Sequence, residues 1–407
     1  MKKILLFSLI LITISKFSYA HYFSESYSNW IILDNKVSAT FTILKLEATR
    51  VLQIDKFQEI GQEKQLSEGE VFLEYFKPRI SVLESSKECL LDKVPSLING
   101  KDEYHTIELS YLCASTNSIK IINNVLFDIA QSHVHLSRIS INDQILEKAL
   151  FYNDQTIFIN DLKTNKEKSF VDSLTNFIST GMNHILTGFD HLIFLMGLII
   201  LVNNFKHLLI VITGFTLGHS VTLALVALNI VVPNTLMIEA LIGFTILFIA
   251  AEYMMKDEKN FFPIIAILLS ILTFAAISSL FLQISITLIS FMALILITIG
   301  YFGILRNLEN KGSFRMIITS LFGVIHGFGF GTFLFNSEFD QTNIISALFG
   351  FNLGVEIGQI IFLMIFILLN LSLIKLLKSK NHQYLMQTLM IIVSSLGFYW
   401  FIQRLYF

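Results

Sequence analysis

A succession of apolar stretches, separated by short polar connections, fills the sequence from about Val171 to the C-terminus. A helix needs about 20 mostly apolar residues to cross the hydrocarbon core of a bilayer. Charged residues make up only 15% of the 407 residues, compared with roughly 25% in soluble proteins. We therefore expect a polytopic α-helical membrane domain over residues 171–407. Its eight predicted spans are residues 188–202, 208–228, 236–254, 261–280, 284–305, 316–335, 344–371 and 385–401.

Basic side chains are concentrated in every second connection between the predicted spans. Lys206, Lys256, Arg306 and Lys375 lie in such connections, whereas the alternate ones carry asparagine, glutamine or acidic residues. Loops rich in lysine and arginine lie on the cytoplasmic side of a membrane. We therefore expect a multi-pass protein of the bacterial inner (cytoplasmic) membrane. The N-terminal part, and the short tail that contains Arg404, should lie in the periplasm or outside.

Residues 1–20 have the pattern of a cleavable secretory signal peptide. Lys2 and Lys3 precede an apolar run over residues 4–14, and small residues follow at Ser18 and Ala20. Such a run is too short to span a bilayer comfortably, and the arrangement is typical of a leader removed after Ala20. The alternative is an uncleaved membrane anchor.

Residues 21–168 have the composition of a water-exposed domain, with frequent charges and short apolar runs. Polar and apolar residues alternate, as in half-buried strands, over residues 36–43, 105–112, 119–127, 133–141 and 156–159. We predict a mostly β periplasmic domain, with a tight turn at Asp34–Asn35 and either a long loop or helices over residues 53–76. The chain's two cysteines, Cys89 and Cys113, both lie here. An oxidising compartment favours a disulfide between them; free thiols or a soft metal site are the alternatives.

Ionisable side chains within the apolar spans are the main candidates for function, because each costs at least about 2.5 kcal/mol to insert and needs a partner. We predict a metal site in the outer half of the helix bundle, formed by His184, Asp190, His191, His219, His326 and Glu356. The secondary polar candidates are Asn352, Gln359 and Glu239. Histidine with carboxylate and amide ligands suits a divalent nickel, cobalt, zinc or copper ion. The alternative is a purely structural polar network.

Residue spacing decides whether these side chains can meet. Gly-x-x-x-Gly pairs accompany the polar residues of three spans, at 214/218, 323/327 and 350/354, and small residues at this spacing let helices pack closely. His184 and His191 are seven residues apart, about 10 Å along an ideal helix. One ion can bind both only if the helix is unwound around Gly188. Otherwise the two histidines would bind the ion one after the other along its path.

The motif His184-Ile-Leu-Thr-Gly188-Phe-Asp190-His191 resembles the first-helix signature of the HupE/UreJ family, His-Pro-x-x-Gly-x-Asp-His. His326-Gly327 is similar to a later His-Gly motif of that family. Ile185 replaces the family's proline, and the upstream His-Gly of the second motif is missing. The resemblance covers residues 171 to the C-terminus and implies a permease for nickel or cobalt. The layout with an exported domain resembles a long branch of the family.

The exported domain has a second, separate candidate metal site. Cleavage after Ala20 would make His21 the N-terminal residue, and His133 and His135 share one face of a predicted strand. An N-terminal histidine with a distant His-x-His pair resembles the copper site of particulate methane monooxygenase in pattern. The alternative is an exposed His21 with histidines on the surface of a strand.

Three classes of function are compatible with these features. The first is transport of a divalent transition-metal ion, nickel or cobalt favoured, with the exported domain capturing the ion. The second is an intramembrane metal-dependent hydrolase, in which His191, His219 and His326 hold zinc and Glu356 or Asp190 acts as the base. The third is a metal-sensing binding protein. We favour transport over an enzymatic role.

Composition and motifs also limit the partners. The formal net charge is −2, with no basic excess for nucleic acid, and the sequence lacks a phosphate-binding loop for a nucleotide. The expected partners are the lipid bilayer and the metal ion. Assembly into a homo-oligomer and binding of proteins that mature metalloenzymes are further possibilities.

Overall fold

The computed structural model describes residues 25–98, 104–115, 118–130, 133–141, 144–159, 170–202, 204–228, 230–231, 234–256, 258–282, 286–308, 311–335, 344–377 and 379–406. The predicted signal peptide and His21 lie outside the described residues. The chain divides into two compact units, Met1–Lys163 and Thr164–Phe407. Each is described by itself.

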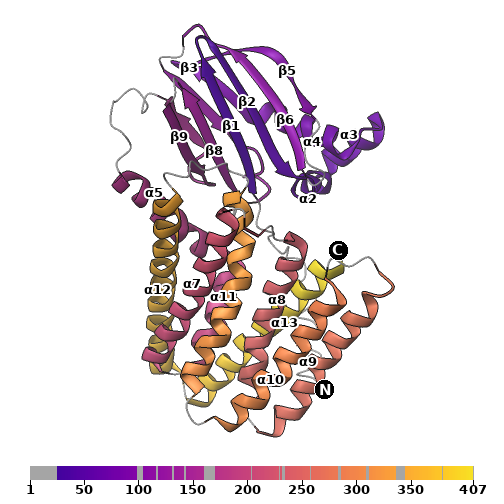
Figure 1. Ribbon diagram of the computed structural model, residues 1–407, viewed down its shortest axis with the longest axis vertical. Coiled ribbons are helices and arrows are strands. Elements are labelled where there is room, and N and C mark those ends of the chain that lie inside the picture. The colour runs from indigo at the N-terminus through magenta and orange to yellow at the C-terminus, as the bar shows by residue number, and fades with distance from the viewer. Residues whose placement is uncertain are drawn as a thin grey trace. The chain divides into compact units, whose positions relative to one another are not determined.

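The N-terminal unit consists of two β-sheets with a few short helices (Figure 1). The six-stranded sheet has the order β5-β6-β2-β1-β8-β9, and the four-stranded sheet has the order β10-β7-β3-β4. Neighbouring strands are antiparallel except for β1 and β8, which run parallel. The strands are β1 (Glu25–Leu33), β2 (Lys36–Leu44), β3 (Ile80–Glu84), β4 (Lys87–Glu88), β5 (Leu90–Ile98), β6 (Tyr104–Leu112), β7 (Ile119–Asn123), β8 (Val134–Ile141), β9 (Gln144–Leu150) and β10 (Thr156–Phe158).

The local structure of this unit agrees with its sequence pattern. The predicted turn at Asp34–Asn35 joins β1 to β2, and Asp34 adopts a left-handed backbone with φ of 52°. Residues 53–76 are largely helical rather than a long loop. The helices here are α2 (Lys45–Ala48), η1 (Thr49–Gln53), α3 (Asp55–Lys64), α4 (Glu68–Phe76) and η2 (Lys77–Arg79).

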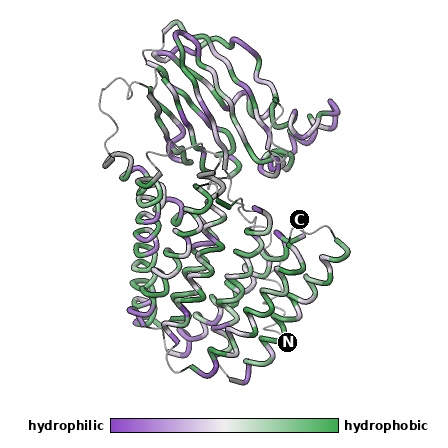
Figure 2. The backbone as a smooth tube through the Cα atoms, viewed as in Figure 1, coloured by the Kyte–Doolittle hydropathy of each residue, from purple (hydrophilic) through white to green (hydrophobic). Residues whose placement is uncertain are grey.

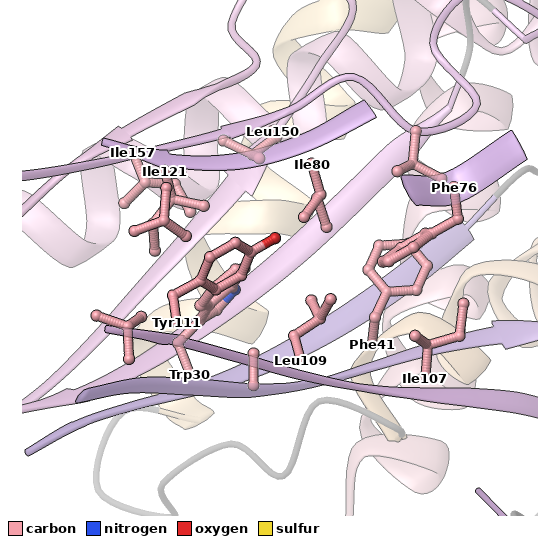
Figure 3. Close-up of a cluster of buried hydrophobic side chains, with 14 of the residues drawn as sticks. Trp30, Phe41, Phe76, Ile80, Ile107, Leu109, Tyr111, Ile121, Leu150 and Ile157 are labelled. Carbon is pink, nitrogen blue, oxygen red and sulfur yellow. The ribbon is translucent and has the colours of Figure 1, made fainter. Parts of the chain in front are cut away.

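The core of the N-terminal unit lies between its two sheets. Figure 3 shows side chains from both sheets in this core, among them Trp30 and Phe41 of the larger sheet and Ile121 and Ile157 of the smaller one. All four side chains are almost completely buried, and burying side chains of this size contributes roughly 1.5–3 kcal/mol each. The predicted disulfide joins Cys89, next to β4, to Cys113 at the end of β6.

The C-terminal unit consists of helices and short connections in the part that the structure describes, and a helix lies in each of the eight predicted spans. Figure 2 shows hydrophobic residues along these helices. The helices are α5 (Phe170–Thr187), α6 (Phe189–Leu201), α7 (Phe205–Ala227), α8 (Thr235–Met254), α9 (Glu258–Ser278), α10 (Leu288–Asn307), α11 (Lys311–Phe335), α12 (Ile344–Leu376) and α13 (Ser379–Tyr406). Within the described residues, six are long and apolar enough to cross a membrane.

The first span differs from the prediction, because it does not begin at residue 188. The 13-residue helix α6 rises only about 20 Å, too little to cross a bilayer alone. It follows α5 after a bend of 73° at Gly188, and the two helices together form either one broken span or a re-entrant loop. The apolar-length rule does not identify α5, because polar residues such as Asn176 and Asn183 interrupt its apolar sequence.

Three helix pairs, α7 with α11, α5 with α12, and α8 with α13, pack along much of their length. A Cβ atom on Gly218 of α7 would lie 1.9 Å from the backbone oxygen of Ser320 in α11. A Cβ on Gly354 of α12 would likewise lie 2.1 Å from the backbone oxygen of Ile178 in α5. The expectation that small residues bring these helices together is therefore confirmed.

Candidate metal centre

Three buried histidines from three consecutive helices converge inside the helical unit. His184 lies in α5, His191 in α6 and His219 in α7. Their side chains are at most 3% exposed, and one ring nitrogen from each lies within 4.8 Å of the others. Three imidazoles at this separation can close around a single ion with a modest adjustment of their rings, because zinc-like ions bind histidine nitrogen at about 2.0–2.1 Å.

The bend at Gly188 brings two of these histidines together. The ring centroids of His184 and His191 are 4.8 Å apart, about half of their separation along a straight helix. The helix is therefore broken at Gly188, the arrangement that one shared ion requires. A Cβ atom at this position would lie 2.8 Å from both the backbone oxygen of His184 and Nδ1 of His191. Glycine is the residue that leaves both groups in place.

Asp190 fixes the protonation pattern of His191. Its Oδ1 is 3.0 Å from Nδ1 of His191, and the same oxygen accepts a hydrogen bond from the backbone N–H of His191. A carboxylate only accepts hydrogen bonds, so Nδ1 carries the proton of the neutral ring. Nε2 of His191 therefore has its lone pair available for a metal.

Asn352 of α12 likewise determines which ring nitrogen of His219 carries the proton. The amide nitrogen of Asn352 donates a hydrogen bond to the backbone oxygen of Leu348, which orients the amide oxygen toward His219. This oxygen is 3.3 Å from Nδ1 of His219, so Nδ1 donates and Nε2 has the lone pair. Within the described residues, Nε2 of His219 is buried and has no hydrogen-bond partner.

His326 of α11 lies against the three histidines and is oriented by Thr245 of α8. The hydroxyl of Thr245 donates to the backbone oxygen of Ile242, so its oxygen accepts the proton of Nε2 of His326, 2.9 Å away. Nδ1 of His326 then has the lone pair, and among the described residues this buried atom has no hydrogen-bond partner. The ring centroid of His326 is 5.1 Å from that of His191, so His326 adjoins the cluster, whereas the nitrogens within 4.8 Å of one another belong to the other three histidines.

Aromatic rings enclose the histidines. Phe194 and Phe215 pack against His326 with ring centroids 5.0 and 5.1 Å away, and Phe351 stacks on His219 at 6.1 Å. These rings exclude water, which strengthens electrostatic interactions at the cluster. Sequence reasoning missed them, because a phenylalanine beside a histidine cannot be distinguished from the 38 phenylalanines in the chain.

Glu356 and Gln359 do not join the converging nitrogen atoms. Glu356 is half-buried, and its Oε1 accepts a hydrogen bond from Thr213 of α7 at 2.7 Å. The side-chain oxygen of Gln359 is buried and accepts a hydrogen bond from Thr216. With the Asn352–His219 contact, these pairs form a row of polar contacts between α7 and α12, beginning at the cluster.

A charged residue that the sequence placed in the terminal tail lies at the site. Arg404 belongs to α13, which continues to Tyr406, and its side chain is buried. Its Nη2 lies 3.8 Å from Oδ2 of Asp190, and its Nη1 donates to the backbone oxygen of Glu239 in α8. No pattern in the sequence identifies this position, because an arginine close to the end of the printed sequence looks like part of a solvated tail.

The predicted histidine pair of the N-terminal unit is buried in a serine network. Ser26 contacts Nε2 of His133 at 2.8 Å and Nδ1 of His135 at 2.6 Å, and Ser28 contacts Nε2 of His135 at 2.7 Å. The alternative of surface-facing strand histidines is wrong, since both rings are at most 1% exposed. Burial lowers the pKa of His135 to about 3. Metal binding here would have to displace the serine contacts.

Comparison with known proteins bears on the helical unit. The family model described as HupE / UreJ protein matches residues 160–287 and 270–404, more than half of the chain. Among curated proteins, none matches the sequence significantly. The matched residues include all four histidines of the centre, and the family match supports transport of a transition-metal ion at the level of the family.

Proposed function

Because the chain belongs to the HupE/UreJ family, we propose that it carries a divalent transition-metal ion, nickel or cobalt favoured, across the bacterial inner membrane by way of the histidine cluster. The ion is the cargo rather than a resident cofactor. The observation that supports this most directly is the convergence of His184, His191 and His219 within 4.8 Å in a buried position.

The donor set fits a borderline ion. Neutral imidazole nitrogens suit nickel, cobalt, copper and zinc, whereas magnesium and calcium prefer oxygen. Asp190, Asn352 and Thr245 each fix one imidazole with its lone pair available. An ion that enters therefore meets ligands already in the required protonation state and releases no proton from them. Such preparation favours binding at neutral pH.

The intramembrane hydrolase is less well supported. That reaction needs a carboxylate beside the metal to accept a proton from water. Asp190 hydrogen-bonds to His191 and lies beside Arg404, and Glu356 hydrogen-bonds to Thr213. Neither carboxylate is placed as a base at the cluster. The polar row between α7 and α12 instead offers a moving ion further contacts beyond the histidines.

We place the N-terminal unit in the periplasm on the basis of the loop charges and the leader, and we assign it a role in capturing the ion. The disulfide between Cys89 and Cys113 is consistent with an oxidising compartment. A metal-sensing function predicts that ions bind without crossing the membrane, so the same transport assay separates it from carriage.

The proposal is tested by metal binding and by uptake with the full chain. Elemental analysis of the purified wild type should find bound nickel or cobalt, and a His191→Ala/His326→Ala variant should lose it. His207→Ala is the matched control, because His207 lies in the first turn of α7, outside the histidine cluster. Liposomes containing the protein should then accumulate the ion. Equal metal content in wild type and double variant would overturn the site, and binding without uptake would favour the hydrolase or the sensor.

A further inference from the structure

We propose that Arg404 is a built-in cation that balances Asp190 while the site is empty and weakens the binding of the arriving metal ion. Arg404 would thereby set an affinity low enough for release. The inference rests on the proposed function, since it concerns the affinity of the same site for its cargo.

The position of Arg404 carries the proposal. The guanidinium is buried beside the centre, with Nη2 3.8 Å from Oδ2 of Asp190. The other oxygen of Asp190 accepts the hydrogen bond from Nδ1 of His191. One carboxylate therefore lies between a fixed cation and a histidine of the cluster. A charge on Arg404 acts on the metal position through this carboxylate and directly through the water-poor interior.

The charges at the site show the direction of the effect. A guanidinium keeps its charge at physiological pH, so Arg404 and Asp190 cancel each other, and the imidazoles are neutral when they can bind metal. A divalent ion that enters then meets no unbalanced negative charge from Asp190. Removing the positive charge of Arg404 leaves Asp190 unbalanced and increases the attraction. Coulomb interactions between buried charges are large enough to change affinity by tenfold or more.

A purely structural role predicts the opposite sign. Arg404 also donates to the backbone oxygen of Glu239 and lies over the ring of Trp400, with 5.6 Å between the guanidinium carbon and the ring centroid. These contacts connect α13 to α8 and to its own preceding turn. If they were the whole function of Arg404, its loss would loosen the site and weaken metal binding.

The experiment measures nickel affinity of the purified full chain by titration calorimetry, with Arg404→Gln and the charge-conserving Arg404→Lys. We expect the dissociation constant of Arg404→Gln to fall at least about tenfold, and that of Arg404→Lys to stay within about threefold of wild type. Uptake into liposomes by Arg404→Gln should slow, because the ion leaves a tighter site less readily. Circular dichroism and gel filtration check that each variant is folded.

Asp190→Asn tests whether the effect passes through the carboxylate, and it also serves if Arg404→Gln alone does not fold. The single variant leaves Arg404 unbalanced and should bind nickel much more weakly than wild type. Adding Arg404→Gln to it should restore part of the affinity, whereas a structural arginine predicts a further loss. Unchanged or weaker binding by folded Arg404→Gln, or no restoration in the double variant, would overturn the inference. Absence of binding by the wild type would instead overturn the proposed function.

Discussion

At the scale of single residues, the centre depends as much on the partners of the histidines as on the histidines themselves. Asp190, Asn352 and Thr245 each accept a hydrogen bond from one ring nitrogen of a histidine, so that the other ring nitrogen has the lone pair. Such partners fix ring orientation and typically contribute 10- to 100-fold to metal affinity. Asp190 could be inferred from the sequence because it adjoins His191. Asn352 and Thr245 lie 133 and 81 residues from the histidines that they contact, and no local pattern connects them.

Thr245→Val removes one such partner with little change of side-chain volume. Without the acceptor, His326 loses the contact that holds the proton on Nε2, and its Nδ1 lone pair is no longer fixed toward the cluster. We expect nickel affinity to fall about 10- to 100-fold, measured by calorimetry on the full chain. Thr298→Val is the control, because Thr298 is also buried but donates only to the backbone oxygen of Leu294 in its own helix. Equal affinities of the two variants would contradict the assigned role.

Gly188→Ala tests the bend itself. The new methyl group would lie 2.8 Å from the backbone oxygen of His184 and from Nδ1 of His191, so one of these groups must move. We expect metal binding to fall at least tenfold while the helix content stays close to that of wild type. Gly303→Ala is the matched control, since a Cβ at Gly303 meets nothing within 4 Å. Normal binding by Gly188→Ala would show that the bend does not depend on glycine.

At the scale of helices, the apolar length of each segment predicted where helices lie, because crossing a bilayer is a requirement on length and composition alone. Of the eight predicted spans, six coincide with helices of the described residues that are long and apolar enough to cross a membrane. The same rule missed α5, because exposed polar residues such as Asn176 and Ser179 break its apolar length. The Gly-x-x-x-Gly pairs identified helices that pack closely, but they did not identify which helices are partners. Pairing depends on contacts between segments far apart in the chain, such as Gly218 with Ser320.

Close packing of α7 on α11 makes a specific prediction for Gly323→Ala. A Cβ at Gly323 would lie 2.0 Å from the backbone oxygen of Phe215, and backbone atoms cannot move aside as a flexible side chain can. We expect a loss of thermal stability in detergent, by several degrees or more, or a failure to fold. Gly300→Ala, where a Cβ meets nothing within 4 Å, should leave the melting temperature unchanged or slightly higher. A similar melting temperature for both variants would contradict the packing argument.

At the scale of the whole molecule, the two units bury polar groups in different ways. The helical unit places histidines around a common point, whereas the N-terminal unit surrounds His133 and His135 with serine hydroxyls and with Phe41 and Phe127. The His-x-His spacing in the sequence could not distinguish these outcomes, because strand alternation says that two side chains share a face but not whether that face is covered. Capture of metal by the N-terminal unit stays a prediction.

The buried His135 predicts that the N-terminal unit loses stability in acid. Its pKa is lowered by burial from 6.5 to about 3, so the folded unit favours the neutral ring. The free energy of unfolding is unaffected by this group above pH 6.5 and decreases as the pH falls from 6.5 toward 3. The total decrease at pH 3 is on the order of 4 kcal/mol. The protection of β1 and β8 amides against hydrogen exchange in the full chain, corrected for the intrinsic pH dependence of exchange, should therefore fall over this range.

His135→Leu isolates this contribution, because acidic residues titrate over the lower part of the same range. The variant loses the bonds to Ser26 and Ser28, so it should be less stable than wild type at pH 7. Its exchange rates in β1 and β8 should nevertheless change less between pH 6.5 and 4, after correction for the intrinsic pH dependence of exchange, because the group that becomes charged is gone. The same pH dependence in both proteins would mean that another group causes the acid sensitivity, and that His135 accepts a proton without unfolding its strand.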